Sequence, residues 1–237
     1  MSLVTTVYVR EGLVMAADSR LTLSNQQQQG NQQIIQLSVT MSDSNRKLFV
    51  TQNRVAIGTF GQADIQGVPI AGFIDSFIAA LPATQSPQQT AQALLTYFRG
   101  MNPIPNTSFH IAGYDSANPP SQEVWLVEVL NNQVQRQNQV NQQGITYGGE
   151  VDVVTRLFQP VAIAGPNNTW LPLPPVSIPI NFFTIQDAID FVVYIIRTTI
   201  DTIRFQIRPK TVGGPIDVLV IRPSSIEWVN QKSLKMP

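Results

Sequence analysis

The stretch VTTVYVREGLVMAADSR, residues 4–20, decides how this chain begins to fold. Residues 4–9 and 13–17 are short runs rich in apolar and β-branched side chains, separated by the polar break REG at 10–12. Runs of this composition favour strands, and a short break containing glycine favours a tight connection. The sequence therefore predicts an antiparallel hairpin, so the chain starts inside a sheet.

Outward from this hairpin, side-chain periodicity predicts further strands and several helices. Strands are predicted at residues 47–50, 54–60, 107–114, 123–130, 133–140, 216–221 and 226–229, and helices at 63–81, 87–98, 150–158 and 184–205. The last helix carries an apolar stripe from Ile185 to Ile203, and Thr184 with Asp187 resembles a capping box at its start.

Two segments show neither the helical nor the strand periodicity of apolar residues. Residues 24–36 are rich in glutamine and are interpreted as an extended loop, an insertion with weak flanking strand. Residues 160–179 are rich in proline and are predicted to be a loop without regular elements. We expect one α+β domain over residues 1–237, with helices packed outside a sandwich of antiparallel sheets.

Charge and residue content exclude several classes of function. Fifteen basic and fifteen acidic side chains balance without a basic block, so a nucleic-acid partner is not expected. Cysteine is absent, which excludes disulfides, thiolate metal ligands and a cysteine nucleophile. The single histidine, His110, lies between Phe109 and Ile111 and is interpreted as structural. We expect neither a cofactor nor a metal.

The sequence also carries no signal for secretion or membrane insertion. Its start, MSLVTTVYVREG, lacks a charged region followed by an apolar stretch of signal-peptide length. Runs of about eighteen apolar residues do not occur either. We therefore predict a soluble, cytoplasmic protein that has no membrane partner.

Several motifs resemble one family in the order in which they occur. The segment 11–20, EGLVMAADSR, resembles the first hairpin of proteasome β-subunits, and its DSR ending resembles the bacterial ancestral-type β-subunit relatives called Anbu. The segments KLF at 47–49 and TFGQAD at 59–64 resemble later motifs of the family, as do DTIR at 201–204 and TVGGPIDV at 211–218. Together the matches span almost the whole chain.

This resemblance implies a fold, an activity and an assembly. The fold would be the four-layer αββα sandwich of N-terminal-nucleophile (Ntn) hydrolases, which places two antiparallel sheets between helical layers. The activity would be hydrolysis of a peptide or another amide bond. The assembly would be a homo-oligomer of the ring or helical-arc kind.

The resemblance also implies the roles of four residues. Ser2 stands at the position of the N-terminal nucleophile, and removal of Met1 would leave it with a free α-amine. An unperturbed amine of this kind has a pKa of about 8, which suits a general base near neutral pH. Lys47 matches the catalytic lysine and Asp18 the acid that holds it, while Gly61 matches the glycine whose backbone N–H stabilises the oxyanion. Arg20 is expected to help fix this cluster.

Departures from the family pattern keep other interpretations open. Serine replaces the usual threonine at position 2, and the segments 147–149 and 209–213, which should support the amine, lack the usual acid. Asp201 and Thr211 are the nearest polar candidates. MSL is also compatible with a vector-derived leader. A catalytically inactive proteasome-like subunit with a structural or assembly role is therefore the alternative, and a small-molecule Ntn amidase is a third possibility.

Each site residue also has a plainer interpretation. Asp18 and Lys47 would serve equally as a structural ion pair inside a sandwich. Gly61 would simply end a strand, and the run 213–215, GGP, is interpreted as a tight turn rather than a phosphate-binding loop. The glutamine-rich tract is a solvated loop in one interpretation and a cover over the site in the other.

Overall fold

A computed structural model describes residues 2–28, 34–174 and 177–233 of the chain. Its described part combines two five-stranded sheets with four α-helices, so the expected mixture of helices and antiparallel sheets is confirmed. Among these residues, no helix is both long and apolar enough to cross a membrane.

The first sheet contains the hairpin at the start of the chain. Its strand order is β12-β1-β2-β15-β16, with every neighbouring pair antiparallel. Strands β1 and β2 are joined by a tight turn, which confirms the predicted hairpin. The strands of this sheet are β1 (Leu3–Val9), β2 (Gly12–Ala17), β12 (Gly144–Gly149), β15 (Asp217–Ile221) and β16 (Ile226–Asn230).

The second sheet is built from the middle of the chain. Its order is β11-β10-β9-β6-β5, again antiparallel throughout. Its strands are β5 (Leu48–Val50), β6 (Ala56–Gly61), β9 (Thr107–Tyr114), β10 (Gln122–Glu128) and β11 (Gln133–Arg136). The observed β9 has the predicted bounds.

Four α-helices accompany the sheets, and two begin with a complete capping box. In the first box Ser86 and Gln89 start a helix, and in the second Thr184 and Asp187 do, as predicted. Two short 3-10 helices, Pro166–Asn168 and Ile180–Phe182, occur between α3 and α4. The α-helices are α1 (Ile70–Ala80), α2 (Pro87–Arg99), α3 (Asp152–Phe158) and α4 (Ile185–Arg204).

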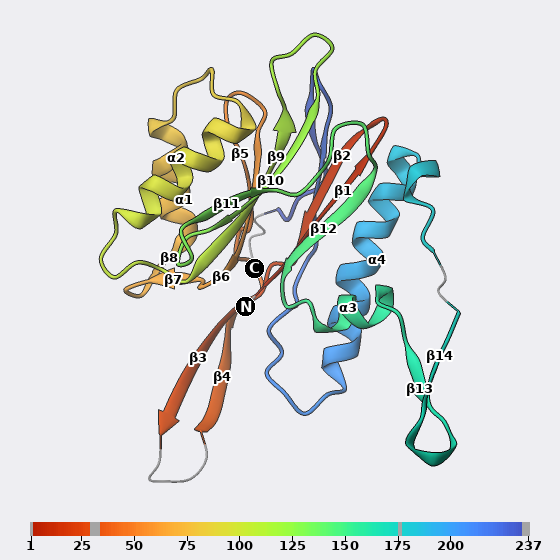
Figure 1. Ribbon diagram of the computed structural model, residues 1–237. Helices are drawn as coiled ribbons and strands as arrows, with labels where there is room; N and C mark the ends of the chain where they lie inside the picture. Colours follow the sequence, from red (N-terminus) through yellow and green to blue (C-terminus); the bar gives the residue numbers. More distant parts are fainter. Residues whose placement is uncertain (1, 29–33, 175–176, 234–237) are drawn as a thin grey trace.

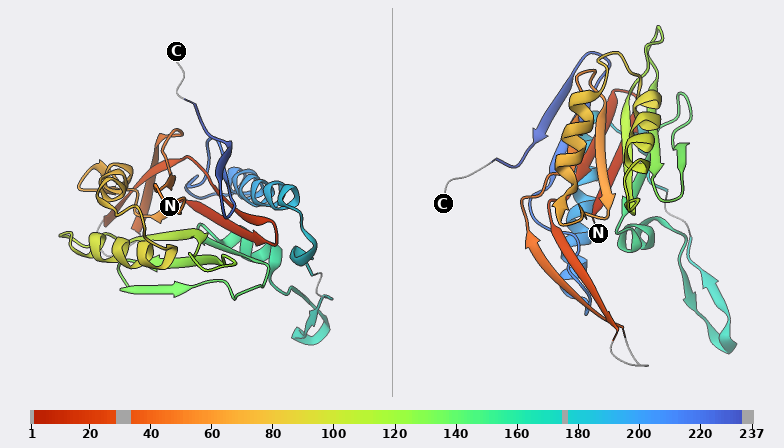
Figure 2. Two further views of the ribbon diagram at one scale, coloured as in Figure 1. Left: turned by 90° about the horizontal axis from the view of Figure 1, so that it is seen from above. Right: turned by 90° about the vertical axis from the view of Figure 1, so that its left-hand side faces the viewer.

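Buried apolar side chains form three separate clusters. One cluster joins α1 and α2 to the second sheet through residues such as Phe98 and Phe109. Another joins α3 and α4 to the first sheet through residues such as Val14 and Val192. The third contains side chains from both sheets, which accordingly face each other. Figures 1 and 2 show α1 and α2 on one side of the sheets and α4 on the other.

Both segments predicted to be loops contain paired strands, so the loop prediction is wrong for the proline-rich segment, while the weak flanking strand expected at the glutamine-rich tract is a regular hairpin. The glutamine-rich tract belongs to the hairpin of β3 (Leu21–Gln28) and β4 (Ile34–Ser42), and residues 29–33 of the tract lie outside the described part. The proline-rich segment contains the hairpin of β13 (Ala162–Ala164) and β14 (Trp170–Pro172). Figure 1 shows both hairpins projecting from the body of the molecule.

Two further differences concern the bounds of elements. The helix predicted at 63–81 begins only at Ile70, because two short strands, β7 (Asp64–Ile65) and β8 (Val68–Pro69), precede it. Strand β12 was not predicted from the sequence. It pairs with β1 along its whole length and leads directly into the candidate site.

Candidate active site

The carboxylate of Asp18 is the centre of a buried cluster at the end of β2. Its Oδ1 accepts hydrogen bonds from Lys47 Nζ at 2.7 Å and from the backbone N–H of Leu3 at 3.0 Å. Its Oδ2 accepts from the backbone N–H groups of Arg20 at 3.1 Å and Gly213 at 2.9 Å. Four donors from four parts of the chain therefore fix one fully buried carboxylate.

Lys47 lies directly before β5 and is only 1% exposed. Burial lowers the pKa of its ammonium group because desolvation disfavours the charged form, while the charge and hydrogen bond of Asp18 oppose this effect. The ion pair predicted from the resemblance is therefore present and is shielded from water. A buried pair of this kind is costly to form unless further hydrogen bonds satisfy it, as the three backbone donors do here.

Ser2 lies one peptide bond from this pair, at the start of β1. The Leu3 N–H that follows it contacts Asp18, and the Ser2 carbonyl accepts a hydrogen bond of 2.8 Å from the backbone N–H of Glu150. Ser2 is 4% exposed. Met1, whose removal the sequence interpretation requires, lies outside the described residues.

Gly149 makes room for Ser2 from the neighbouring strand. Its φ is +100°, and a Cβ built on it would lie 1.7 Å from the Ser2 carbonyl oxygen. Only glycine adopts this conformation without strain, and only glycine leaves space for the Ser2 backbone here. The sequence alone did not predict this function of Gly149, and a Cβ on its neighbour Gly148 would instead meet the Phe60 ring.

Gly61 ends β6 close to the same corner. Its φ is +95°, and a Cβ there would lie 2.8 Å from the Asn106 carbonyl oxygen. The N–H of Thr59 donates to the Lys47 carbonyl at 2.9 Å. Backbone N–H groups two residues apart in a strand point to the same side, so the Gly61 N–H also points toward the side from which Lys47 enters.

Arg20 contributes to the cluster in two ways. Its backbone N–H holds Asp18, and its guanidinium group forms two hydrogen bonds to Asp43, of 2.6 and 2.7 Å. These bonds lower the pKa of the Asp43 carboxyl. Because Arg20 precedes β3 and Asp43 follows β4, the pair closes the base of the glutamine-rich hairpin next to the site.

The segments 147–149 and 209–213 contain no acid, as stated above, but the residue whose backbone N–H holds the Ser2 carbonyl is one. Glu150 follows Gly149 directly, and its Oε2 accepts a hydrogen bond of 2.7 Å from the Thr211 hydroxyl. Arg208 reaches both Glu150, at 3.3 Å, and Asp152, at 2.9 Å. Asp201, the other candidate, is exposed on α4 and is not part of this cluster.

His110 lies in β9 and is 1% exposed. Burial lowers its pKa to about 4, so the imidazole is neutral at physiological pH. Its ring meets the Phe60 ring edge-on, with centroids 5.2 Å apart. In the described chain its Nδ1 has no hydrogen-bond partner. Groups of three or more side chains able to hold a metal ion do not occur among the described residues.

Comparison with known proteins places this arrangement in a known fold. No family model and no curated protein sequence matches the chain. Two solved structures of Anbu from Hyphomicrobium sp. strain MC1 do match it. The first, a Gly-1 mutant, has a TM-score of 0.59 and 14% identity and covers 98% of this chain and 86% of its own. The second has a TM-score of 0.58 and 13% identity, with coverage of 98% and 88%.

This chain has the fold of Anbu. The resemblance seen in the sequence motifs is thereby confirmed at the level of the fold. At 13–14% identity the likeness to the Anbu structures does not assign roles to Ser2, Asp18, Lys47 or Gly61.

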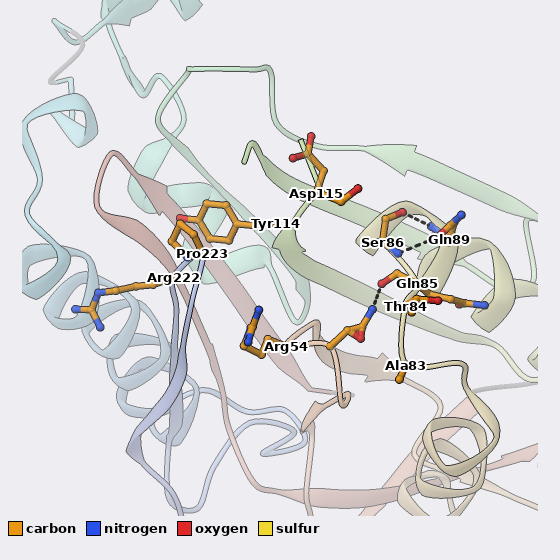
Figure 3. A pocket seen from close by; sticks show the side chains of 12 residues that line it. Arg54, Ala83, Thr84, Gln85, Ser86, Gln89, Tyr114, Asp115, Arg222 and Pro223 are labelled. Carbon is orange, nitrogen blue, oxygen red and sulfur yellow. Dashed lines mark hydrogen bonds between the residues drawn. The ribbon is translucent and has the colours of Figure 1, made fainter. Parts of the chain in front are cut away.

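Four hollows of this Anbu-like fold lie away from the buried cluster. One hollow of about 500 Å³ is lined by Arg54, Tyr114 and Asp115, by the segment 83–86 before α2, and by the turn between β15 and β16. Strand β9 runs from the corner near Gly61 to this hollow at Tyr114. Figure 3 shows that its side chains come from loops, from the end of β9 at Tyr114 and from α2 at Gln89, and that the guanidinium of Arg222 points away from Ser86.

Proposed function

We propose that this chain is a proteasome-like Ntn hydrolase, a peptidase or amidase whose nucleophile is Ser2 after removal of Met1. The observation that carries the proposal is the buried Asp18–Lys47 pair, which hydrogen-bonds to Leu3 N and so lies one peptide bond from Ser2. A sandwich has no packing requirement for a buried charged pair at this place. We also infer that the two sheets and their helices form the four-layer αββα arrangement, which the three apolar clusters support.

The proposed reaction proceeds through an ester on Ser2. The Ser2 amine takes the hydroxyl proton as Oγ attacks the carbonyl carbon of a peptide or amide bond. The Gly61 N–H stabilises the negative oxygen of the tetrahedral intermediate. The amine then returns the proton to the leaving nitrogen as the C–N bond breaks, and water hydrolyses the ester. Lys47 favours the deprotonated hydroxyl by charge, and Asp18 positions Lys47.

A proteasome-like subunit without turnover is the second candidate. The observation that favours it is the burial of Ser2, together with the position of the four described hollows, which are lined by residues other than Ser2, Asp18, Lys47 and Gly61. In this function the Asp18–Lys47 pair would serve only to join β2 to the chain before β5.

We propose further that copies of the chain assemble into a ring or helical arc and act in the cytoplasm. The proposal of assembly is supported by an uncharged segment, residues 157–186, whose hairpin exposes apolar side chains. Trp170 is 71% exposed, and Ile163 and Leu171 are also exposed. Apolar side chains gathered on a projecting hairpin are typical of surfaces that bind another protein. Sedimentation measurements and cell fractionation test these two points.

The experiment that tests the activity is intact-mass analysis before and after treatment with a β-lactone. We expect loss of Met1 and one adduct on the native-start protein. Ser2→Ala should abolish the adduct and Lys47→Ala should slow it, while Ser44→Ala, at an exposed serine, should not change it. A protein produced with Ser2 as its first residue that gains no adduct would leave the structural subunit as the function.

A further inference from the structure

The backbone hydrogen bonds of Ser2 and Leu3 point in opposite directions, toward two different neighbouring segments. Leu3 hydrogen-bonds toward β2, because its N–H donates to Asp18 Oδ1 and its carbonyl accepts from the Asp18 N–H at 3.3 Å. Ser2 faces the other way, since its carbonyl accepts from the Glu150 N–H at 2.8 Å. The N and C=O of one residue in an extended chain point to the same side. The Ser2 nitrogen is therefore also directed toward the backbone of Glu150, from which the Glu150 side chain extends.

The carboxylate of Glu150 is fixed rather than mobile. Its side chain is 12% exposed, and its two oxygens accept hydrogen bonds from different groups. Thr211, which donates to Oε2, is 1% exposed and lies in the same loop as Gly213, the donor to Asp18. The loop 211–213 thus contacts both acids that flank Ser2.

The charged groups around Glu150 carry more negative than positive charge. Arg208 bridges Glu150 and Asp152, so two carboxylates share one guanidinium group. Arg156, near Asp152, is exposed to solvent, which screens its charge. Lys210 donates to backbone carbonyls at the end of α4 and not to these acids. On the other side of Ser2, Lys47 is paired with Asp18 and not with Glu150.

We propose that Glu150 is the positioning residue of the Ser2 terminus. Its backbone N–H holds the Ser2 carbonyl, and its carboxylate, fixed by Thr211 and Arg208, orients and stabilises the protonated Ser2 amine that forms when the hydroxyl proton is transferred. The inference rests on the proposed function, in which this amine is the general base. It replaces the acid that the sequence interpretation found missing with one that comes directly after Gly149.

The first test compares Glu150→Gln with the unaltered protein, both produced with Ser2 as the first residue. Glutamine keeps the backbone N–H and the size of the side chain but removes the charge. We expect the NMR titration midpoint of the Ser2 amine to fall by about half a pH unit or more. We also expect the β-lactone adduct rate at pH 7 to fall about tenfold, since small misplacements at reacting groups have large effects. Glu227→Gln, at an exposed carboxylate, is the matched control and should change neither value.

A second pair of variants separates positioning from general loss of stability. Thr211→Val removes the hydroxyl that holds Glu150, and Thr211→Ser retains it. We expect Thr211→Val to lower the amine midpoint and the adduct rate, and Thr211→Ser to restore both. The proposal is overturned if Glu150→Gln or Thr211→Val titrates and reacts like the unaltered protein. Should the unaltered protein gain no adduct, the hydrolase function fails, yet the amine titration still decides whether Glu150 acts on Ser2.

Discussion

The two ends of the sheets differ in whether their charged side chains are buried or exposed. At the end that holds Ser2, the charges of Asp18 and Lys47 are buried and satisfied by hydrogen bonds from several elements. At the far end, a hollow of about 500 Å³ is lined mainly by polar side chains, among them Arg54, Tyr114 and Asp115. Burying an ion pair costs free energy and depends on hydrogen bonds from many parts of the fold. A polar hollow at the surface carries no such cost. The proposed site therefore lies at the buried ion pair and not at this hollow.

The same contrast occurs between two adjacent residues. Arg46 pairs with Asp75, and both side chains are about half exposed. Lys47, the next residue, pairs with Asp18, and both are almost fully buried. The comparison of the two ends can therefore be sharpened with substitutions only one residue apart.

The largest effect is expected at Lys47. Lys47→Met should destabilise the protein by roughly 3–5 kcal/mol, because it leaves the Asp18 carboxylate buried without its cation. Arg46→Met should cost at most about 1 kcal/mol, because the exposed pair is weakened by water. Urea unfolding at pH 7 measures both values. Equal values for the two variants would remove the distinction between the buried and the exposed pair.

A substitution at Gly149 tests whether the backbone next to Ser2 tolerates an added side chain. Gly149→Ala should cost roughly 3 kcal/mol, since the new Cβ would overlap the Ser2 carbonyl and the φ of +100° would be strained. Gly72→Ala, in α1, is the matched control. A Cβ there meets nothing within 4 Å, and alanine favours the helix by about 1 kcal/mol. Opposite signs of the two changes in unfolding free energy are expected, and a stabilising Gly149→Ala would contradict this view of the corner.

His110, buried between the two ends, should make stability depend on pH. Its pKa of about 4 in the folded state lies below the ordinary value of 6.5, so the unfolded chain takes up a proton at a pH where the folded chain does not. Stability is therefore lost as pH falls below 6.5, by about 2 kcal/mol at pH 5. His110→Leu, which cannot be protonated, should lose that much less stability between pH 7 and pH 5. Identical losses in the two proteins would show that His110 does not contribute.

Much of the fold could be predicted from the sequence because burial imposes a regular pattern. Residues 107–114 form a largely buried strand with the predicted bounds, and Thr184 with Asp187 caps the helix expected there. Strand β12 was missed because GITYGG contains three glycines and forms a strand only by pairing with β1. The glutamine-rich hairpin was predicted only as weak flanking strand, because residues 24–33 show no alternation of apolar and polar residues in the sequence.

The site was predicted only as far as linear motifs reach. Asp18 and Lys47 lie in recognisable segments, and the structure brings them together as expected. Glu150 was missed because its partner Thr211 is 61 residues away, and no local pattern announces such a contact. The space that Gly149 provides for Ser2 is likewise a tertiary feature. Composition and the spacing of residues in the sequence do not predict contacts between distant segments, and these contacts complete the candidate site.

The smallest effect is expected at the far end, where Arg54 lines the hollow. Its φ is +59°, a conformation that glycine adopts more readily, and its side chain is exposed. Arg54→Gly should therefore change the unfolding free energy by less than about 1 kcal/mol, with relief of strain offset by the greater freedom of glycine in the unfolded chain. It should also leave the β-lactone adduct rate unchanged, because β9 separates Arg54 from the corner at Gly61. An adduct rate that falls with Arg54→Gly as far as with Lys47→Ala would mean that the chemistry is not confined to the Ser2 end.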